Sequence, residues 1–286
     1  MRPLRTITQT ARDISVSNLS YRLSLGRRDD EFRELGETLD DLFGRLQASF
    51  ESQRHFVANA SHELRSPLTA ERTLLQVALA DPDASAATLR SACEKALKWN
   101  DQQGRLIAAL LTLASSERGI EEWEQFDLAE ITGKVIVERR PEADRRRIRI
   151  VADLTAAPAT GDPSLAEILV ANLIDNSIRH NIDEGSVEIR TTLAGGAADL
   201  VVRNTGIVIA PGEVDRLFQP FQRLGLARLS HAGGHGLGLA IVRAIAGVHD
   251  ATLMATARPE GGLGIEVRFP DAPAGSPSRA ERGAPG

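Results

Sequence analysis

The stretch ASHELRSPLTA, residues 60–70, places a histidine beside a glutamate and a proline five residues after the histidine. A neutral imidazole has an ordinary pKa near 6.5, so His62 could act as a nucleophile at neutral pH. Pro67 would remove one backbone bond from a helix, at a cost of about 3 kcal/mol, and so needs a compensating reason. A zinc site of the HExxH type is excluded, because no second histidine stands four residues after His62. Taken alone, the pentapeptide is more typical of an ordinary surface histidine.

Two asparagines four residues apart form a second candidate site. Asn172 and Asn176 lie in ILVANLIDNSIRH, and this spacing brings both side chains to one face of a helix. Asparagine is a mediocre helix former. Its amide oxygen suits a hard cation such as Mg²⁺, which usually also binds water and phosphate oxygens. The pair therefore indicates a polar ligand, although two surface asparagines would give the same pattern.

A third candidate site combines a strand end with a glycine-rich turn. Asn204 and Gly206 follow an extended run, where a side chain can reach a ligand and a backbone can approach it closely. The segment GGHGLGLAIVRAI then places glycines at 233, 234, 236 and 238 before an apolar helix. Backbone amides at a helix N-terminus favour an anion such as phosphate. A structural turn would explain these glycines equally well, and no Gly-Lys-Ser/Thr follows to make a Walker loop.

Heptad spacing in the first half of the chain predicts long helices that position the histidine. One apolar stripe runs from Leu4 to Ile14, and a second runs from Phe32 to Leu46 and continues into the histidine motif without a breaker. Residues 81–83, Asp-Pro-Asp, predict a turn, and the pattern over 89–113 predicts a second long helix. An antiparallel hairpin leaves its apolar seam half covered, so we expect a four-helix bundle formed by two chains.

The sequence after Gly119 predicts a mixed α/β domain. Helical patterns cover about 127–140, 162–180 and 237–249. Between them lie five runs typical of strands, which are RIRIVADL, SVEIRTTL, ADLVVRNT, ATLMATAR and LGIEVRFP. Such interleaving favours helices packed on a sheet, with a core of its own.

Composition narrows the possible classes of protein. The chain of 286 residues has a net charge of −5 and a pI of about 5.8, which gives no overall reason to expect nucleic-acid binding. No apolar run approaches the roughly 20 residues that cross a bilayer, and the polar N-terminus does not resemble a signal peptide. Cys93, the single cysteine, excludes an intrachain disulfide, and its apolar helical position predicts a core residue.

Taken in order, the motifs HELRSP, NLIDN, NTG, LFQPF, GHGLGL and GGLGIEV resemble those of bacterial sensor histidine kinases. The segment before them resembles a HAMP linker, so the resemblance covers nearly all of residues 1–270. It implies an α plus α/β fold class, in which a dimeric helical bundle precedes an α/β-sandwich ATP-binding domain of the GHKL, or Bergerat, type. The implied segments are a HAMP linker (1–50), a dimerisation and histidine phosphotransfer domain (51–118), a catalytic ATP-binding domain (119–271) and a disordered tail (272–286).

The resemblance also implies catalytic roles in the hairpin. His62 matches the phosphoacceptor histidine, and Glu63 matches the acid that holds the imidazole and accepts its proton during attack on ATP. Arg65 would screen phosphate charge, and Pro67 would bend the helix so that it can flex between signalling states. Ser66 stands where relatives have a Thr or Asn that positions water for phosphatase action, so weak phosphatase activity is expected.

A nucleotide site is implied in the second half of the chain. Asn176 matches the Mg²⁺-binding asparagine, supported by Asn172. Arg179 would contact phosphate, and His180 would stack near adenine. Asn204 would accept a hydrogen bond from the adenine amino group. The remaining matches are Gly206 at the strand end, the aromatic pair, and the phosphate end of the lid: Phe218, Phe221, Gly234, Gly236, Leu237 and Gly238.

Besides Ser66, three residues depart from the family pattern. Asn204 replaces an aspartate, Val208 replaces a glycine, and His235 stands where a small hydroxyl residue is common. The first two leave open a signalling scaffold that has lost ATP binding. A non-kinase ATPase of the same nucleotide-binding fold is a further alternative.

The implied function is that of a homodimeric, ATP-dependent protein-histidine kinase. It would use ATP and Mg²⁺ to phosphorylate His62 and would pass the phosphoryl group to an aspartate of a response-regulator receiver domain. No nucleic-acid partner is implied. The parent protein would sit on the cytoplasmic side of the cell membrane through a transmembrane segment missing from this chain, which would itself be soluble.

Overall fold

The computed structural model describes residues 30–116, 120, 122–222 and 236–271. The predicted stripe from Leu4 to Ile14, the glycine at position 234 and the predicted tail over 272–286 lie outside these residues. The chain divides into two compact units between Thr73 and Leu74, and each unit is described by itself.

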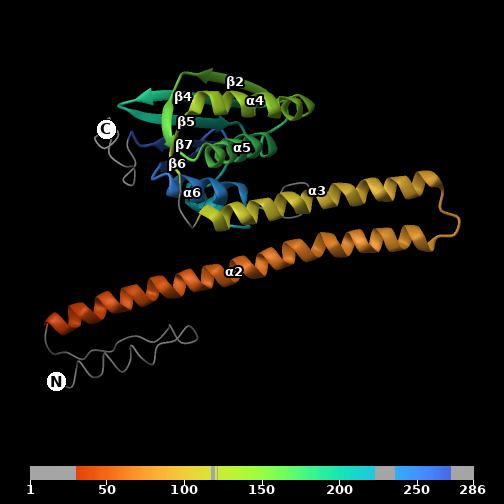
Figure 1. Cartoon of the computed structure of the whole chain (residues 1–286), viewed down its shortest axis with the longest axis horizontal. Coiled ribbons are helices and arrows are strands. Elements are labelled where there is room, and N and C mark those ends of the chain that lie inside the picture. Colours follow the sequence, from red (N-terminus) through yellow and green to blue (C-terminus); the bar gives the residue numbers. More distant parts are fainter. Residues whose placement is uncertain (1–29, 117–119, 121, 223–235, 272–286) are drawn as a thin grey trace, which may run out of the picture. The chain divides into compact units, whose positions relative to one another are not determined.

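Two long helices form the first half of the described chain, as the heptad spacing predicted. Helix α2 runs from Asp30 to Ala80 with Pro67 inside it, and α3 runs from Ala86 to Ser116 (Figure 1). The turn between them is held by Asp81, whose Oδ1 accepts a hydrogen bond from the amide of Asp83 at 3.0 Å. The predicted turn is therefore confirmed.

Apolar side chains remain exposed along both helices of the single chain. Leu42, Val57 and Leu97 are examples, with exposed fractions of 47%, 57% and 66%. The prediction that Cys93 belongs to the core is wrong for this chain, because Cys93 is exposed. Its neighbour Ala92 is buried instead, so the buried face of α3 passes one residue before the cysteine. The two-chain bundle stays a prediction.

The second half folds as the predicted α/β domain (Figure 1). All five predicted strands and all three predicted helices form within a few residues of their expected bounds. They are α4 (Leu128–Arg145), β2 (Arg149–Leu154), α5 (Pro163–Arg179), β4 (Ser186–Ala194), β5 (Ala197–Asn204), α6 (Gly238–Val248), β6 (Thr252–Ala257) and β7 (Leu263–Phe269). The sequence did not predict four short elements: β1 (Glu124–Asp127), β3 (Pro158–Gly161) and the 3₁₀ turns η1 (Pro211–Glu213) and η2 (Asp215–Phe218).

Five strands form one sheet in the order β2-β4-β5-β7-β6, in which only β2 and β4 are parallel. Strands β1 and β3 pair antiparallel in a separate small sheet. Residues of β4 alternate between buried Val187 and Ile189 and exposed Glu188 and Arg190. Such alternation means that one face of the sheet is covered and the other faces water, and α4, α5 and α6 contact the strands of this sheet. The domain is a two-layer α/β sandwich.

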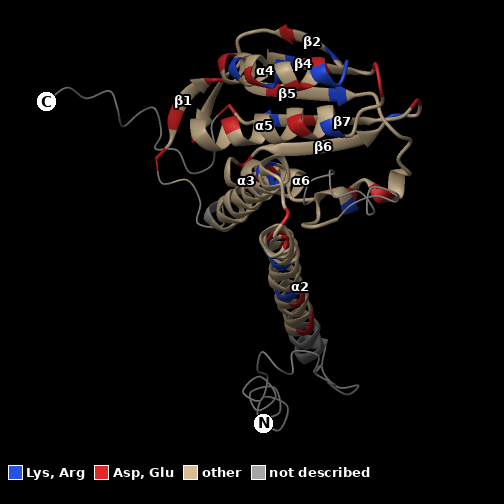
Figure 2. Cartoon of the chain, turned by 90° about the vertical axis from the view of Figure 1, so that its right-hand side faces the viewer, with Lys and Arg blue, Asp and Glu red and all other residues tan. Residues whose placement is uncertain are grey.

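Helices α5 and α6 pack against each other, and α5 begins with a side-chain cap. Asp162 is the N-cap of α5, and its Oδ1 accepts hydrogen bonds from the amides of Ser164 and Leu165 at 2.8 and 3.1 Å. Pro163 occupies the first helical turn, where its missing N–H costs nothing. α6 also contacts α3. Acidic and basic residues are interspersed along α2 and over the sandwich (Figure 2).

Candidate functional site

The predicted catalytic residues of the hairpin lie together on α2. His62, Glu63, Arg65 and Ser66 are all exposed. Ser66 Oγ donates a hydrogen bond to the carbonyl of His62 at 3.0 Å. Ser61, Thr69 and Thr73 donate in the same way to the residue four positions before each. Such back-bonding tends to bend helices, and α2 nevertheless continues through Pro67. An exposed imidazole is accessible to a reactant carried by another domain.

On α5, Asn172 and Asn176 lie half-buried, one turn apart, as predicted. The Nδ2 of Asn172 donates to the carbonyl of Ile168 at 2.8 Å. The Oδ1 of Asn172 faces the start of α6, because a Cβ added to Gly238 would lie 3.1 Å from it. A larger residue at Gly238 would therefore crowd Asn172. The structure brings together these residues of two motifs that are far apart in the sequence.

Arg179 and His180 stand exposed at the C-terminal end of α5. Nearby protein atoms desolvate the Arg179 guanidinium and lower its pKa below the usual value, although Asp175 opposes this shift and the side chain still reaches solvent. Arg146 Nη1 donates to the carbonyl of Arg179 at 3.3 Å. The carbonyl of His180 lies close to Gly206, because a Cβ on that glycine would meet it at 2.8 Å. The end of α5 thus adjoins the end of β5.

Asn204, at the end of β5, is only 4% exposed. Its Nδ2 donates to the carbonyl of Thr205 at 2.7 Å. The reverse amide orientation would place two acceptor oxygens at that distance, so the contact fixes which end of the amide faces the carbonyl. Within the described part of the chain, no donor lies within hydrogen-bonding distance of the Asn204 Oδ1. A buried acceptor without a donor is costly, which points to a ligand that donates.

A network of polar side chains supports the end of β5. The sequence motifs gave no role to the residues of this network. Thr205 Oγ1 donates to Asn181 Oδ1 at 2.6 Å and accepts from the amide of Ser186 at 2.8 Å. Asn181 Nδ2 donates to the carbonyls of Ser177 and Ser186 at 3.0 and 3.1 Å. These hydrogen bonds link the residues that follow α5 to the start of β4 and to Thr205, which follows Asn204. The threonine within NTG was the available sequence signal.

The predicted glycine turn precedes α6. Gly236 has φ +69°, which favours glycine, and a Cβ there would lie 2.7 Å from the carbonyl of Gln222. The carbonyl of Gly236 accepts a hydrogen bond from the amide of Phe221 at 2.9 Å. Leu237 is buried and Gly238 begins α6. The predicted Gly234 lies outside the described residues.

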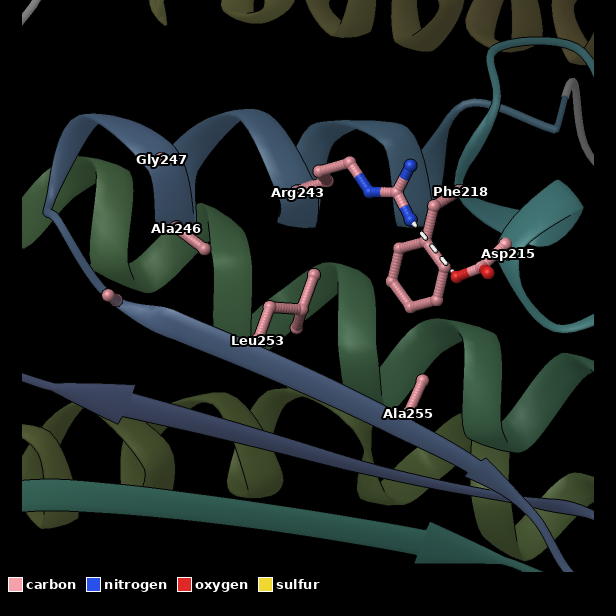
Figure 3. Close-up of a pocket in the computed structure, with 8 residues that line it drawn as sticks. Asp215, Phe218, Arg243, Ala246, Gly247, Leu253 and Ala255 are labelled. Carbon is pink, nitrogen blue, oxygen red and sulfur yellow. Dashed lines mark ion pairs between the residues drawn. The ribbon is translucent and has the colours of Figure 1, made fainter.

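Phe218 is buried beside a cavity of about 280 Å³ whose floor is made of small and apolar residues of α6 and β6, among them Ala246 and Leu253 (Figure 3). Arg243 of α6 covers the ring of Phe218, with its guanidinium carbon 4.7 Å from the ring centroid. Arg243 also lies 3.9 Å from Asp215, measured from Nη2 to Oδ1. Sequence reasoning assigned no role to Arg243.

The fully buried His249 is a further residue that the sequence did not single out. Its Nε2 accepts a hydrogen bond from the amide of Asp162 at 3.1 Å, so its Nδ1 carries the proton that bonds the carbonyl of Ile245 at 2.8 Å. Trp123 and Phe269 contact the ring edge-on, at centroid distances of 6.2 and 5.3 Å. Burial lowers the pKa of His249 below its usual value, against the opposing effect of the bond to the carbonyl of Ile245. The imidazole is therefore a neutral structural link between α6 and the N-cap of α5.

Comparison with known proteins matches three family models in succession. They are described as HAMP domain (residues 1–48), His Kinase A (phospho-acceptor) domain (residues 52–119) and Histidine kinase-, DNA gyrase B-, and HSP90-like ATPase (residues 161–273). Within the residues that the structure describes, no helix is long and apolar enough to cross a membrane.

Similar proteins cover most of this chain. It is 42% identical over 269 residues to the Sensor protein CutS of Streptomyces coelicolor, covering 94% of this chain and 65% of CutS. It is 33% identical over 235 residues to the Sensor-like histidine kinase SenX3 of Mycobacterium tuberculosis, covering 80% of this chain and 55% of SenX3. The chain thus spans less than two thirds of these relatives. The solved structure of the Acinetobacter baumannii histidine kinase AdeS superposes with a TM-score of 0.58 at 26% identity, covering 73% of this chain and 96% of that one.

Proposed function

Because this chain belongs to the two-component sensor histidine kinases, we propose that it phosphorylates His62 with ATP and passes the phosphoryl group to an aspartate of a response-regulator receiver domain. One observation carries the proposal: a solvent-exposed histidine on α2 accompanies a buried acceptor at the end of β5 that has no donor among the residues the structure describes. A non-kinase ATPase does not require an exposed acceptor histidine. A scaffold without ATP binding does not require a buried acceptor for a ligand.

The adenine base would bind at the end of β5. The Oδ1 of Asn204 would accept a hydrogen bond from the adenine amino group, with His180 stacking near the base. Gly206 supports this placement, because any side chain there would meet the carbonyl of His180 and the Nδ2 of Asn204. The departure from aspartate to asparagine keeps an acceptor in place, so it does not favour the scaffold.

The triphosphate would lie between α5 and the start of α6. Backbone amides of Gly236, Leu237 and Gly238 would bind phosphate oxygens, as an open helix N-terminus favours anions. Arg179 would add a positive charge. Phe218 and Phe221 would supply the aromatic pair of the site, and Gly234 is kept as a proposed nucleotide-binding residue.

We assign Mg²⁺ to Asn176, supported by Asn172. Across the described ranges no three His, Cys, Asp or Glu residues gather into a metal cluster. An amide oxygen is a hard ligand that suits Mg²⁺, and waters and substrate phosphate oxygens would complete the coordination of the ion. The ion supplies neutralisation and orientation of the phosphate charge.

Phosphorylation then proceeds by substitution at the γ-phosphorus. A ring nitrogen of His62 attacks, a P–N bond forms, and the bond to the β–γ bridging oxygen breaks, so that ADP leaves. The proton on the other ring nitrogen passes to Glu63, and Arg65 screens the transferred charge. Catalysis here is positioning and electrostatic stabilisation. In phosphotransfer a receiver carboxylate attacks the same phosphorus and the P–N bond breaks, returning the ring nitrogen. Ser66 would hold water weakly for the opposing phosphatase reaction.

We further propose that the chain acts as a homodimer, since the exposed apolar side chains of α2 and α3 need burial. Membrane attachment of the parent protein is proposed from the HAMP match. The domain boundaries at 50, 118 and 271 are kept as proposals.

Substitution of the acceptor tests this function. His62→Gln should abolish incorporation of labelled phosphate from ATP and leave binding of a non-hydrolysable ATP analogue unchanged, because the two sites lie on different elements. His55→Gln is the matched control, since His55 is another exposed histidine of α2. Label that is stable to alkali and lost in acid, found in His62→Gln, would overturn the assignment.

A further inference from the structure

Arg243 makes two contacts from the middle of α6, and their strengths differ. Its partner Asp215 is 98% exposed and 3.9 Å away, and an ion pair so open to water contributes about 0–1 kcal/mol. Its other partner is the ring of Phe218, which is 3% exposed and lies 4.7 Å below the guanidinium carbon (Figure 3). A cation over a buried ring is held more strongly than an exposed ion pair, so the contact with Phe218 dominates.

Phe218 lies at the start of a short segment that packs on the glycine turn. Three residues later, the amide of Phe221 bonds to the carbonyl of Gly236 at 2.9 Å. The carbonyl of Gln222 fills the space where a side chain of Gly236 would be. Residues 218–222 therefore form one wall of the turn that opens α6. Arg243 fixes the beginning of this wall from the same helix that the turn begins.

The other side of the turn is also occupied. Gly238 stands so close to Asn172 that an added Cβ would lie 3.1 Å from its Oδ1. The turn 236–238 is thus held between α5 and residues 218–222. Any outward shift of residues 218–222 would release one side of it while leaving the sheet and the helices in place.

We propose that Arg243 is a positioning residue for phosphate binding. By clamping Phe218 it holds residues 218–222 against Gly236, and so keeps the amides of the turn 236–238 aligned for the triphosphate. This inference rests on the proposed function, because it takes ATP as the ligand of that turn. The inference predicts that loss of Arg243 weakens binding of the triphosphate and leaves binding of the adenine base unchanged.

The test compares two nucleotides in Arg243→Met, which removes the charge and keeps an unbranched side chain. Binding of a non-hydrolysable ATP analogue should weaken by about 3- to 10-fold, whereas binding of AMP should change by less than about 2-fold. Arg243→Lys, which retains a cation over the ring, should recover most of the analogue affinity. Asp215→Asn, the control for the exposed ion pair, should stay within about 2-fold of the wild type.

Three outcomes would overturn the inference. They are unchanged analogue binding in Arg243→Met, an equal loss for AMP and the analogue, and a failure of Arg243→Lys to recover affinity. Thermal unfolding of each variant shows whether it is folded. If Arg243→Met does not fold, Phe218→Leu, which removes the ring beneath the guanidinium, carries the same comparison of the analogue with AMP. Absence of analogue binding by the wild-type protein would overturn the proposed function and this inference with it.

Discussion

Replacement of Asn204 tests how this chain would recognise adenine. The side chain is 4% exposed, and its Nδ2 is held by the carbonyl of Thr205 at 2.7 Å. This contact leaves the Oδ1 as the group that meets a ligand. Asn204→Leu keeps a similar volume and removes the acceptor. The adenine amino group would then be buried without a partner.

The magnitude follows from the cost of an unpaired buried donor. Leaving such a group without an acceptor costs about 1–3 kcal/mol, and each 1.4 kcal/mol corresponds to a factor of ten in affinity. We therefore expect ATP binding to weaken by roughly 5- to 150-fold in Asn204→Leu. Inosine triphosphate presents an oxygen in place of the amino group. That oxygen would face the Oδ1, so the wild-type protein should bind it less well than ATP, and Asn204→Leu should lose this preference.

Calorimetric titration with non-hydrolysable analogues of ATP and inosine triphosphate measures both quantities. Asn204→Asp is the matched control, because a carboxylate also accepts a hydrogen bond and should retain the preference for ATP. Thr205→Ser keeps the hydroxyl that bonds Asn181 and Ser186 and should behave like the wild type. Unchanged ATP affinity in Asn204→Leu, or an unchanged ratio between the two nucleotides, would refute the reasoning from the buried amide.

Two further predictions concern the metal and a buried imidazole. Asn176→Ala should abolish Mg²⁺-dependent binding of the ATP analogue together with phosphorylation of His62; a normal phosphorylation rate, measured with labelled ATP, would contradict the proposed metal site. His249 has a lowered pKa in the folded state, so its contribution to stability is complete above the ordinary pKa of 6.5 and is lost as the pH falls below that value towards the folded pKa. Urea unfolding between pH 5 and 8 should show this loss in the wild type and less of it in His249→Gln; equal pH dependence in both proteins would exclude His249 as its source.

Periodicity explains why most elements could be predicted from the sequence. The strands of the main sheet alternate apolar and polar residues or form apolar runs. Both α5 and α6 carry apolar faces, and α5 also begins at a capping aspartate. Strands β1 and β3 have four residues each, EQFD and PATG, and are too short to show a period. They form because they pair with each other across 30 residues of sequence. Cys93 shows the same limit on a helix, since a heptad pattern did not decide which of two neighbouring positions is buried in a single chain.

Site residues could be predicted where they belong to a short sequence motif. They could not be predicted where their role depends on a contact with a residue far away in the sequence. Asn172, Asn204 and Gly238 stand in short recognisable motifs. The structure places Asn172 within α5, Asn204 at the end of β5 and Gly238 at the start of α6, as those motifs predicted. Asn181 acts through Thr205, 24 residues away, and Arg243 acts through Phe218 on another element. Neither partner is implied by spacing along the chain. Long-range pairing of this kind depends on the packed domain.

The positions of His249 and Gly238 explain how remote packing can set the geometry of the turn. Two of the contacts between α5 and α6 lie near opposite ends of α6: the amide of Asp162 bonds to His249, and Gly238 abuts Asn172. Ten residues separate 162 from 172, and eleven separate 238 from 249. At 1.5 Å per residue the two spans are about 15 and 16–17 Å. Because these two spans are nearly equal, fixing the contact at one end of them also fixes how the two helices align at the other end. The buried imidazole therefore helps to hold Gly238 against Asn172, although it lies a full helix length from the proposed phosphate site.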